Sequence, residues 1–191
     1  EWLREHENYR PELVVQLRPT SPIRPVTMVD QALQLLLDDP QGDSVRGVVP
    51  AGQNPYKMWR IENGQMKPLL SVPGIAEPYN APRQALPAAF WQTGHIDAIR
   101  VRAILEKQSL SGEVILPLLI DPRYTIDIDT LRDWQLAERL MEELPALGLD
   151  FVRPDGAQHA RRRLPFDVQL IVFDFDGVMT DNRVWVDQDG R

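Results

Sequence analysis

The chain has 191 residues, 43% of them hydrophobic, and a formal net charge of −7. This length and composition suit a globular protein with one good core, or with one domain and part of another, and exclude a disordered chain. The acidic net charge argues against a general nucleic-acid binder. The chain has no cysteine, which excludes disulfides and thiolate metal sites. No apolar run approaches the ~18 residues that a membrane span needs.

The first fifty residues alternate between strand and helix patterns. "ELVVQL" is a short apolar run that predicts a buried strand over residues 12–17. The apolar spacing of residues 28–37 predicts a helix, and Thr27 with Asp30 resembles a capping box. "SVRGVVPA" predicts a second strand over residues 44–51. Strand, helix and strand in this order are typical of a parallel α/β sheet.

The middle of the chain predicts loops first and then further α/β elements. Residues 54–95 are rich in proline, glycine and aromatic residues, and Asn63-Gly64 is a strong hairpin signal. A strand and a helix are expected over residues 95–110, and another strand over residues 112–120. "TIDIDTLRDWQLAERLMEEL" begins extended and becomes a helix, with Thr130 as the expected N-cap.

The periodicity fails over residues 148–165, where the sequence is polar, and we place the linker at residues 148–167. This stretch predicts a solvated linker. "FDVQLIVF" then predicts a new strand over residues 166–173. We therefore expect one domain over residues 1–147 and the beginning of a second domain over residues 168–191.

Two carboxylates in "YTIDIDT" form the first candidate site. Side chains alternate along a strand, so Asp127 and Asp129 would point the same way. Two adjacent carboxylates repel each other unless a cation lies between them, and Mg²⁺ is bound by one or two carboxylates together with phosphate oxygens. The alternative is a strand end with one capping and one exposed aspartate.

The loop after the first predicted strand, "RPTSPIR", is the second candidate site. Hydroxyl and guanidinium groups ahead of a helix suit an anion or a nucleotide. They come from Arg18, Thr20, Ser21 and Arg24. The alternative, which the residues alone favour, is a proline-stiffened turn whose hydroxyls cap the next helix.

Two cations in aromatic, proline-bracketed loops form the third candidate site. Lys57 lies in "NPYKMW" and Arg83 in "PRQALP". A cation fixed in such a loop can bind a carboxylate or offset charge on a reacting phosphate. Taken singly, each residue is better explained as an ordinary surface cation.

Taken together, "RPTSPIR", "NPYKMW", "PRQALP" and "TIDIDT" occur in this order with suitable gaps. This combination resembles the acylneuraminate cytidylyltransferases, the CMP-sialic acid synthetases, over residues 1–145. The resemblance implies a nucleotidyltransferase with a Rossmann-like mixed α/β sheet, acting as a homodimer or higher homo-oligomer. It implies attack of a sugar-acid hydroxyl on the α-phosphate of CTP, with release of pyrophosphate and with Mg²⁺ as cofactor.

The resemblance also assigns roles to residues. Asp127 and Asp129 would hold Mg²⁺, while Lys57 and Arg83 would be the catalytic cations that contact the sugar acid. The remaining positions would bind substrate: Arg18, Thr20, Ser21, Arg24, Gln84 and Thr93.

Three positions depart from the family pattern. The family often has Gln at the position of Arg18, Asn at that of Thr93, and Tyr at that of Asp97. These positions lie near the sugar in the family. The substrate expected is therefore a nonulosonic or ulosonic acid that need not be N-acetylneuraminate.

The family's phosphate loop, which contains glycine and lysine, is expected upstream of Glu1. Without its backbone N–H groups the triphosphate is not held, so the 191 residues alone are expected to make no CMP-sugar. We expect a cytoplasmic enzyme with no nucleic-acid or membrane partner.

The end of the chain carries a second motif. "LIVFDFDGVMTD" resembles the first motif of haloacid-dehalogenase-type phosphatases, in particular those acting on ulosonate phosphates. The resemblance implies that Asp174 attacks phosphorus, that Asp176 is the general acid/base, and that both contribute to a Mg²⁺ site. Such a phosphatase would release the sugar acid that the transferase then activates. The alternative is a phosphatase whose nucleotidyltransferase-like N-terminal module is not catalytic.

Overall fold

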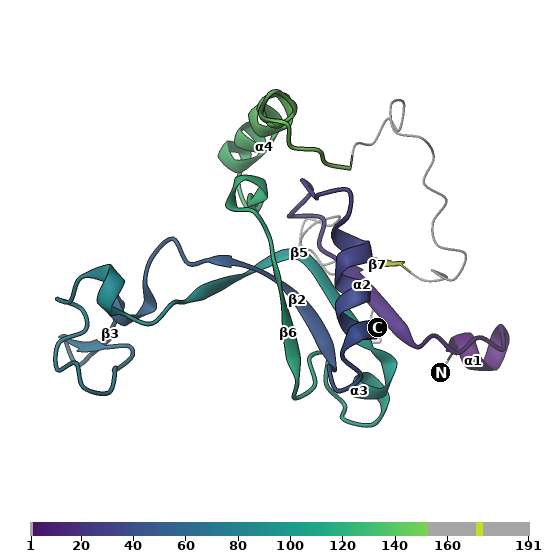
Figure 1. Ribbon diagram of the computed structural model, residues 1–191, viewed down its shortest axis with the longest axis horizontal. Helices are drawn as coiled ribbons and strands as arrows, with labels where there is room; N and C mark the ends of the chain where they lie inside the picture. The colour runs from purple at the N-terminus through teal and green to yellow at the C-terminus, as the bar shows by residue number, and fades with distance from the viewer. Residues whose placement is uncertain (1, 153–170, 174–191) are drawn as a thin grey trace, which may run out of the picture. The chain divides into compact units, whose positions relative to one another are not determined.

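The computed structural model describes residues 2–152 and 171–173 of an α/β protein (Figure 1). The chain divides into two compact units. The first contains the chain up to Gly47 together with the chain from Thr93 onward, and the second is Val48–Gln92. The two units are described separately below.

The sheet has the strand order β6-β2-β5-β1-β7. The strands are β1 Leu13–Leu17, β2 Ser44–Pro50, β5 Phe90–Arg100, β6 Ile115–Leu119 and β7 Ile171–Phe173. Strand β5 runs antiparallel to β1, with Val15 opposite Ala98, whereas β7 runs parallel to β1. The sheet is therefore mixed. The mixed α/β sheet that the sequence analysis expected is confirmed, with the antiparallel β5 lying between β2 and β1.

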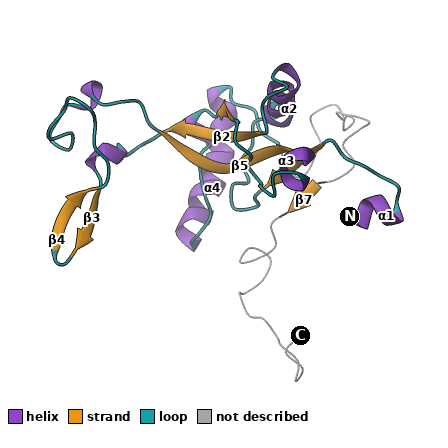
Figure 2. Cartoon of the chain, turned by 90° about the horizontal axis from the view of Figure 1, so that it is seen from below, coloured by secondary structure: helices purple, strands orange, loops and turns teal. Residues whose placement is uncertain are grey.

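Four α-helices and four short 3₁₀ helices accompany the strands in the described residues. They are α1 Trp2–His6, α2 Met28–Asp38, α3 Val101–Leu105, α4 Leu131–Glu143, η1 Pro55–Lys57, η2 Arg83–Ala85, η3 Pro122–Tyr124 and η4 Leu144–Leu147. Met28, Ala32 and Leu36 are fully buried, one turn apart along α2. This stripe confirms the predicted amphipathic helix. Helices α2 and α4 lie on opposite sides of the sheet (Figure 2).

The two predicted helix caps behave differently. The Thr130 side chain accepts from the backbone N–H of Asp133, and the Asp133 carboxylate accepts from the backbone N–H of Thr130, so the predicted cap is a capping box. The box predicted at Thr27 is wrong, because this side chain makes no cap hydrogen bond within the described residues. The Met28 N–H donates to the Pro25 carbonyl. This turn holds Thr27 at φ −94° and ψ −1°, outside the extended region that an N-cap requires.

We expect Thr130→Ala to lower the free energy of unfolding by about 1 kcal/mol, as loss of an N-cap typically does. Thr27→Ala is the matched control, since it removes the same side chain from a helix start where it makes no cap bond. Its effect should stay within about 0.5 kcal/mol. Urea unfolding followed by circular dichroism measures both variants. Equal losses would show that the box contributes nothing to stability.

The second unit contains a two-stranded hairpin formed by β3 Trp59–Glu62 and β4 Gln65–Pro68. Asn63 and Gly64 connect these strands with φ values of 50° and 76°. Two consecutive residues with positive φ match the twist of a tight hairpin, so the Asn-Gly prediction is confirmed. The ring of Trp59 lies 4.4 Å from that of Tyr79, centroid to centroid, and fixes the hairpin to the loop that follows it.

Parts of the sequence-based predictions fall on residues that are not described. The predicted strand over residues 166–173 is confirmed at β7, whereas most of the predicted linker lies outside the described residues. Asp174 and Asp176 lie outside them as well, so the phosphatase motif stays a prediction. None of the helices in the described ranges has the length and apolar character of a transmembrane segment.

Candidate functional site

The loop that follows β1 packs against β5 at Gly94. The backbone N–H of Arg18 donates to the Gly94 carbonyl at 3.3 Å. A Cβ on Gly94 would lie 2.6 Å from Ser21 Oγ and 3.2 Å from Arg18 Cδ, so a larger residue would force these two side chains to shift. Ser21 is buried at this contact. A glycine in the strand therefore sets how closely the loop approaches the sheet.

The segment with the two aspartates lies beside the same loop. The backbone N–H of Ile128 donates to the Thr20 carbonyl at 2.8 Å. Asp127 and Asp129, on either side of Ile128, are both exposed, whereas Ile126 is buried. The two carboxylates thus lie on the solvent side of a segment hydrogen-bonded to the predicted nucleotide loop.

The prediction that this segment is a strand is wrong. In the described part of the chain, residues 125–129 belong to neither a helix nor a strand, and the preceding strand, β6, ends at Leu119. Helix η3 precedes the segment and α4 follows it, and the segment pairs with none of the strands in the described residues. Buried and exposed side chains nevertheless alternate along the segment, as the sequence suggested. An extended loop that packs on one side shows the same alternation as a strand.

Asp127 and Asp129 fit the oxygen ligands that Mg²⁺ prefers in proteins, where one or two carboxylates combine with substrate phosphates. Within the described ranges, no group of three or more His, Cys, Asp or Glu residues is placed to hold a metal ion. Phosphate oxygens and water would therefore have to supply the remaining ligands of a Mg²⁺ ion bound here.

Arg24 is committed largely to the main chain. Its Nε donates to the His95 carbonyl at 3.1 Å, and its Nη2 donates to the Arg18 carbonyl. Burial lowers the pKa of Arg24 to about 10. Arg24 thus fastens the loop to β5, a role that sequence reasoning did not foresee, and a contact between Arg24 and substrate stays a prediction.

His95, which the sequence analysis did not single out, lies fully buried below the loop. Its Nε2 is 3.1 Å from the Tyr124 carbonyl oxygen. Burial lowers the pKa of His95, although hydrogen bonding to Tyr124 and the charge of Asp127 oppose that shift. The imidazole therefore favours the neutral form, in which a protonated Nε2 donates to Tyr124. This contact fixes η3, and with it the start of the aspartate segment, against β5.

Thr93 and Asp97, two positions that depart from the family pattern, are both buried on β5. The hydroxyl of Thr93 donates to the Gly47 carbonyl at 3.2 Å. Asp97 forms ion pairs with Arg18 and Arg46, each with an N–O distance of 3.6 Å. Arg46 was not recognised from the sequence, because a lone arginine inside a strand carries no signal of its partner.

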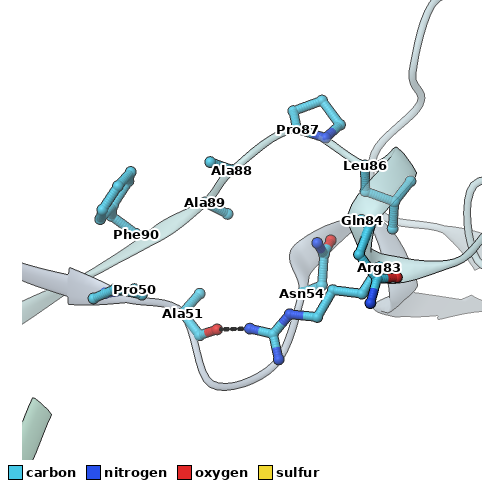
Figure 3. Close-up of a pocket in the computed structure, with 10 residues that line it drawn as sticks. All are labelled: Pro50, Ala51, Asn54, Arg83, Gln84, Leu86, Pro87, Ala88, Ala89 and Phe90. Atoms are coloured by element: carbon cyan, nitrogen blue, oxygen red, sulfur yellow. Dashed lines mark hydrogen bonds between the residues drawn. The ribbon is translucent and has the colours of Figure 1, made fainter.

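The second unit holds the other predicted cations. Arg83 donates to the Ala51 carbonyl beside a hollow of about 390 Å³ (Figure 3). Gln84, Asn54 and Phe90 also line this hollow. Lys57 Nζ donates to the Tyr79 carbonyl at 3.3 Å. Each cation is therefore held by a backbone carbonyl from a segment more than twenty residues away in sequence.

The predicted site residues fall into two groups. The loop, Thr93 and the aspartate segment lie in the first unit, and Lys57, Arg83 and Gln84 lie in the second. No protein-family model matches the chain.

Proposed function

We propose that the protein transfers CMP from CTP to a sialic acid-type sugar acid and releases pyrophosphate. One observation supports this most directly. The 2.8 Å hydrogen bond from Ile128 N to Thr20 O joins the hydroxyl- and arginine-bearing loop to the segment with Asp127 and Asp129. A nucleotide loop and a carboxylate pair for Mg²⁺ need this proximity, because the metal must reach the phosphates that the loop holds.

In the proposed reaction, a sugar hydroxyl oxygen attacks the α-phosphorus of CTP. The new P–O bond forms as the bond to the bridging oxygen of the β-phosphate breaks, the hydroxyl proton passes to solvent, and pyrophosphate leaves. Asp127 and Asp129 would hold Mg²⁺, which offsets phosphate charge. The chain's other contribution is to position its substrates, through the Thr20 hydroxyl of a loop that the buried Ser21 packs against β5.

The cations of the second unit complete the proposal. Lys57 and Arg83 are aimed by backbone carbonyls, and Arg83 shares its hollow with Gln84. A guanidinium and an ammonium group held in this way suit the carboxylate of a sugar acid. The proposal also includes a homodimer and a phosphatase domain whose first motif contains Asp174 and Asp176. A phosphatase with a non-catalytic N-terminal module is the competing function.

The test uses the protein produced from the full reading frame that encodes these residues. We expect pyrophosphate release that requires CTP, Mg²⁺ and one member of a panel of nonulosonic and ulosonic acids. ATP in place of CTP is the control and should give no release. Titration calorimetry with CTP and each sugar acid alone gives a second readout. A protein that binds neither ligand and releases no pyrophosphate would overturn the proposal.

A further inference from the structure

A row of charged side chains crosses the sheet of the first unit, from β2 over β5 to the end of β1. Asp97 lies in the middle, with one oxygen 3.6 Å from Arg46 Nη1 and the other 3.6 Å from Arg18 Nη2. Arg46 Nη2 also donates to Ser111 Oγ at 2.7 Å. The three charged side chains carry a net charge of +1.

Exposure along this row is lowest in the middle, at Asp97, and highest at Arg18. The side chain of Arg46 is 18% exposed, that of Asp97 is 4% exposed, and that of Arg18 is 41% exposed. Ser111 fixes the inner arginine. The row is thus anchored at Arg46 by Ser111 and open to solvent at its other end, at Arg18, in the loop that also carries Thr20.

Arg18 has unused capacity to bind a ligand. A guanidinium has five N–H donors. Within the described residues, the Arg18 side chain donates no hydrogen bond, and its charged contact is the ion pair with Asp97 at a distance beyond hydrogen bonding. Asp97 Oδ1 likewise lacks a hydrogen-bond partner in the described part of the chain. The row therefore orients Arg18 by charge without consuming its donors.

The cost of burying Asp97 argues that the row does more than stabilise the fold. Burial raises the pKa of Asp97, while Arg46 and Arg18 oppose that shift. Buried ion pairs are seldom better for stability than apolar packing of similar volume. Asp97 is a buried carboxylate, and its partner Arg18 is open to solvent beside the candidate site. Its burial is therefore better explained by the positioning of Arg18 than by stability.

We propose that Asp97 and Arg46 are positioning residues that hold Arg18 so that its guanidinium binds an oxyanion of the substrates. This inference rests on the proposed function and adds residues to the same site. The planar fork of an arginine matches both carboxylates and phosphates. The oxyanion is thus the carboxylate of the sugar acid or a phosphate of CTP, and the experiment below separates these two sources.

The test is a double-mutant cycle with Arg18→Gln and Asp97→Asn in the full-reading-frame protein. Affinities for CTP and for the accepted sugar acid are measured separately by calorimetry. We expect Arg18→Gln to weaken binding of one of the two ligands by about tenfold or more. The ligand that is affected identifies the source of the oxyanion. Asp97→Asn should weaken the same ligand's binding, and should have no further effect once Arg18 is replaced, because it acts through Arg18.

Arg139→Gln is the matched control, since it removes an exposed arginine from α4 and should leave both affinities unchanged. Arg18→Gln keeps the test valid if Asp97→Asn does not fold, because Arg18 is partly exposed. Unchanged affinities in Arg18→Gln, or an Asp97→Asn effect of equal size in both backgrounds, would overturn the inference while leaving the proposed function intact. If the unaltered protein bound neither ligand, the proposed function would fail and this inference with it.

Discussion

Replacing Asp127 with alanine is expected to lower kcat/KM for CMP transfer by about 10³-fold. The physical reason is the place of this carboxylate, exposed to solvent in a segment hydrogen-bonded to the Thr20 loop. Mg²⁺ uses few protein ligands, so losing one of two carboxylates removes much of its affinity and of its hold on the phosphates. The measurement is pyrophosphate release from the full-reading-frame protein over a series of Mg²⁺ concentrations. Asp129→Ala should act in the same direction.

Glu138→Gln serves as the control for this experiment. Glu138 is exposed on α4, so the variant removes one surface carboxylate outside the candidate site. Its kcat/KM should stay within about twofold of the unaltered protein, because an exposed surface charge has little effect. If Asp127→Ala retained full CMP transfer, the metal assignment would be wrong. If Asp127→Ala lost neither transferase nor phosphatase activity, the competing phosphatase function would be favoured.

Local sequence signals predicted the local structure of this chain well. The Asn63-Gly64 turn and the apolar stripe of α2 each depend on residues within one turn of each other, so the sequence contains the whole signal. Thr27 and Thr130 show the limit of such signals. Both begin a Thr-x-x-Asp pattern, yet only Thr130 adopts the extended backbone that allows its hydroxyl to cap the helix.

Sequence reasoning missed the features that depend on contacts between residues far apart in the chain. A mixed sheet was expected, but no periodicity within β5 encodes that β2 and β1 become its neighbours. Arg18 and Asp97 were each recognised as unusual, but their ion pair joins the loop after β1 to β5, between residues far apart in sequence. Arg46 completes that row from a third strand. The candidate residues could be found singly, whereas the charge network required the fold.

The largest effect on stability is expected at Asp43, which is 1% exposed at the start of β2. Its Oδ2 accepts from Lys107 Nζ and from the Glu113 N–H, each at 2.8 Å, and from the Val114 N–H at 3.2 Å. These donors come from the segment that precedes β6. We expect Asp43→Ala to lower the free energy of unfolding by about 3 kcal/mol, because it leaves these donors without their buried acceptor. Urea unfolding measures this loss.

Asp38→Asn is the control, since Asp38 is exposed and its Oδ1 accepts a hydrogen bond from Gln34 on the same helix. Its effect should stay within about 0.5 kcal/mol. Gly112 offers an independent test of the same contact. At φ +70°, a Cβ on Gly112 would lie 2.2 Å from Asp43 Cβ, so Gly112→Ala should also destabilise the protein. A stable Gly112→Ala variant would show that the segment can move away from Asp43.

The stabilisation by Asp43 should also depend on pH in one direction. The hydrogen bond from Lys107, followed by those from the Glu113 and Val114 backbones, holds the pKa of Asp43 well below its usual range. A carboxyl group whose pKa is depressed on folding stabilises the folded state fully above its unfolded pKa of about 3.9. That contribution is lost as the pH falls from there towards the folded pKa. The difference in unfolding free energy between the unaltered protein and Asp43→Ala should therefore be constant from pH 7 to about pH 5 and shrink below pH 4. A difference that grew on acidification would mean that Asp43 is protonated in the folded protein, and that the three donors do not act on a charged acceptor.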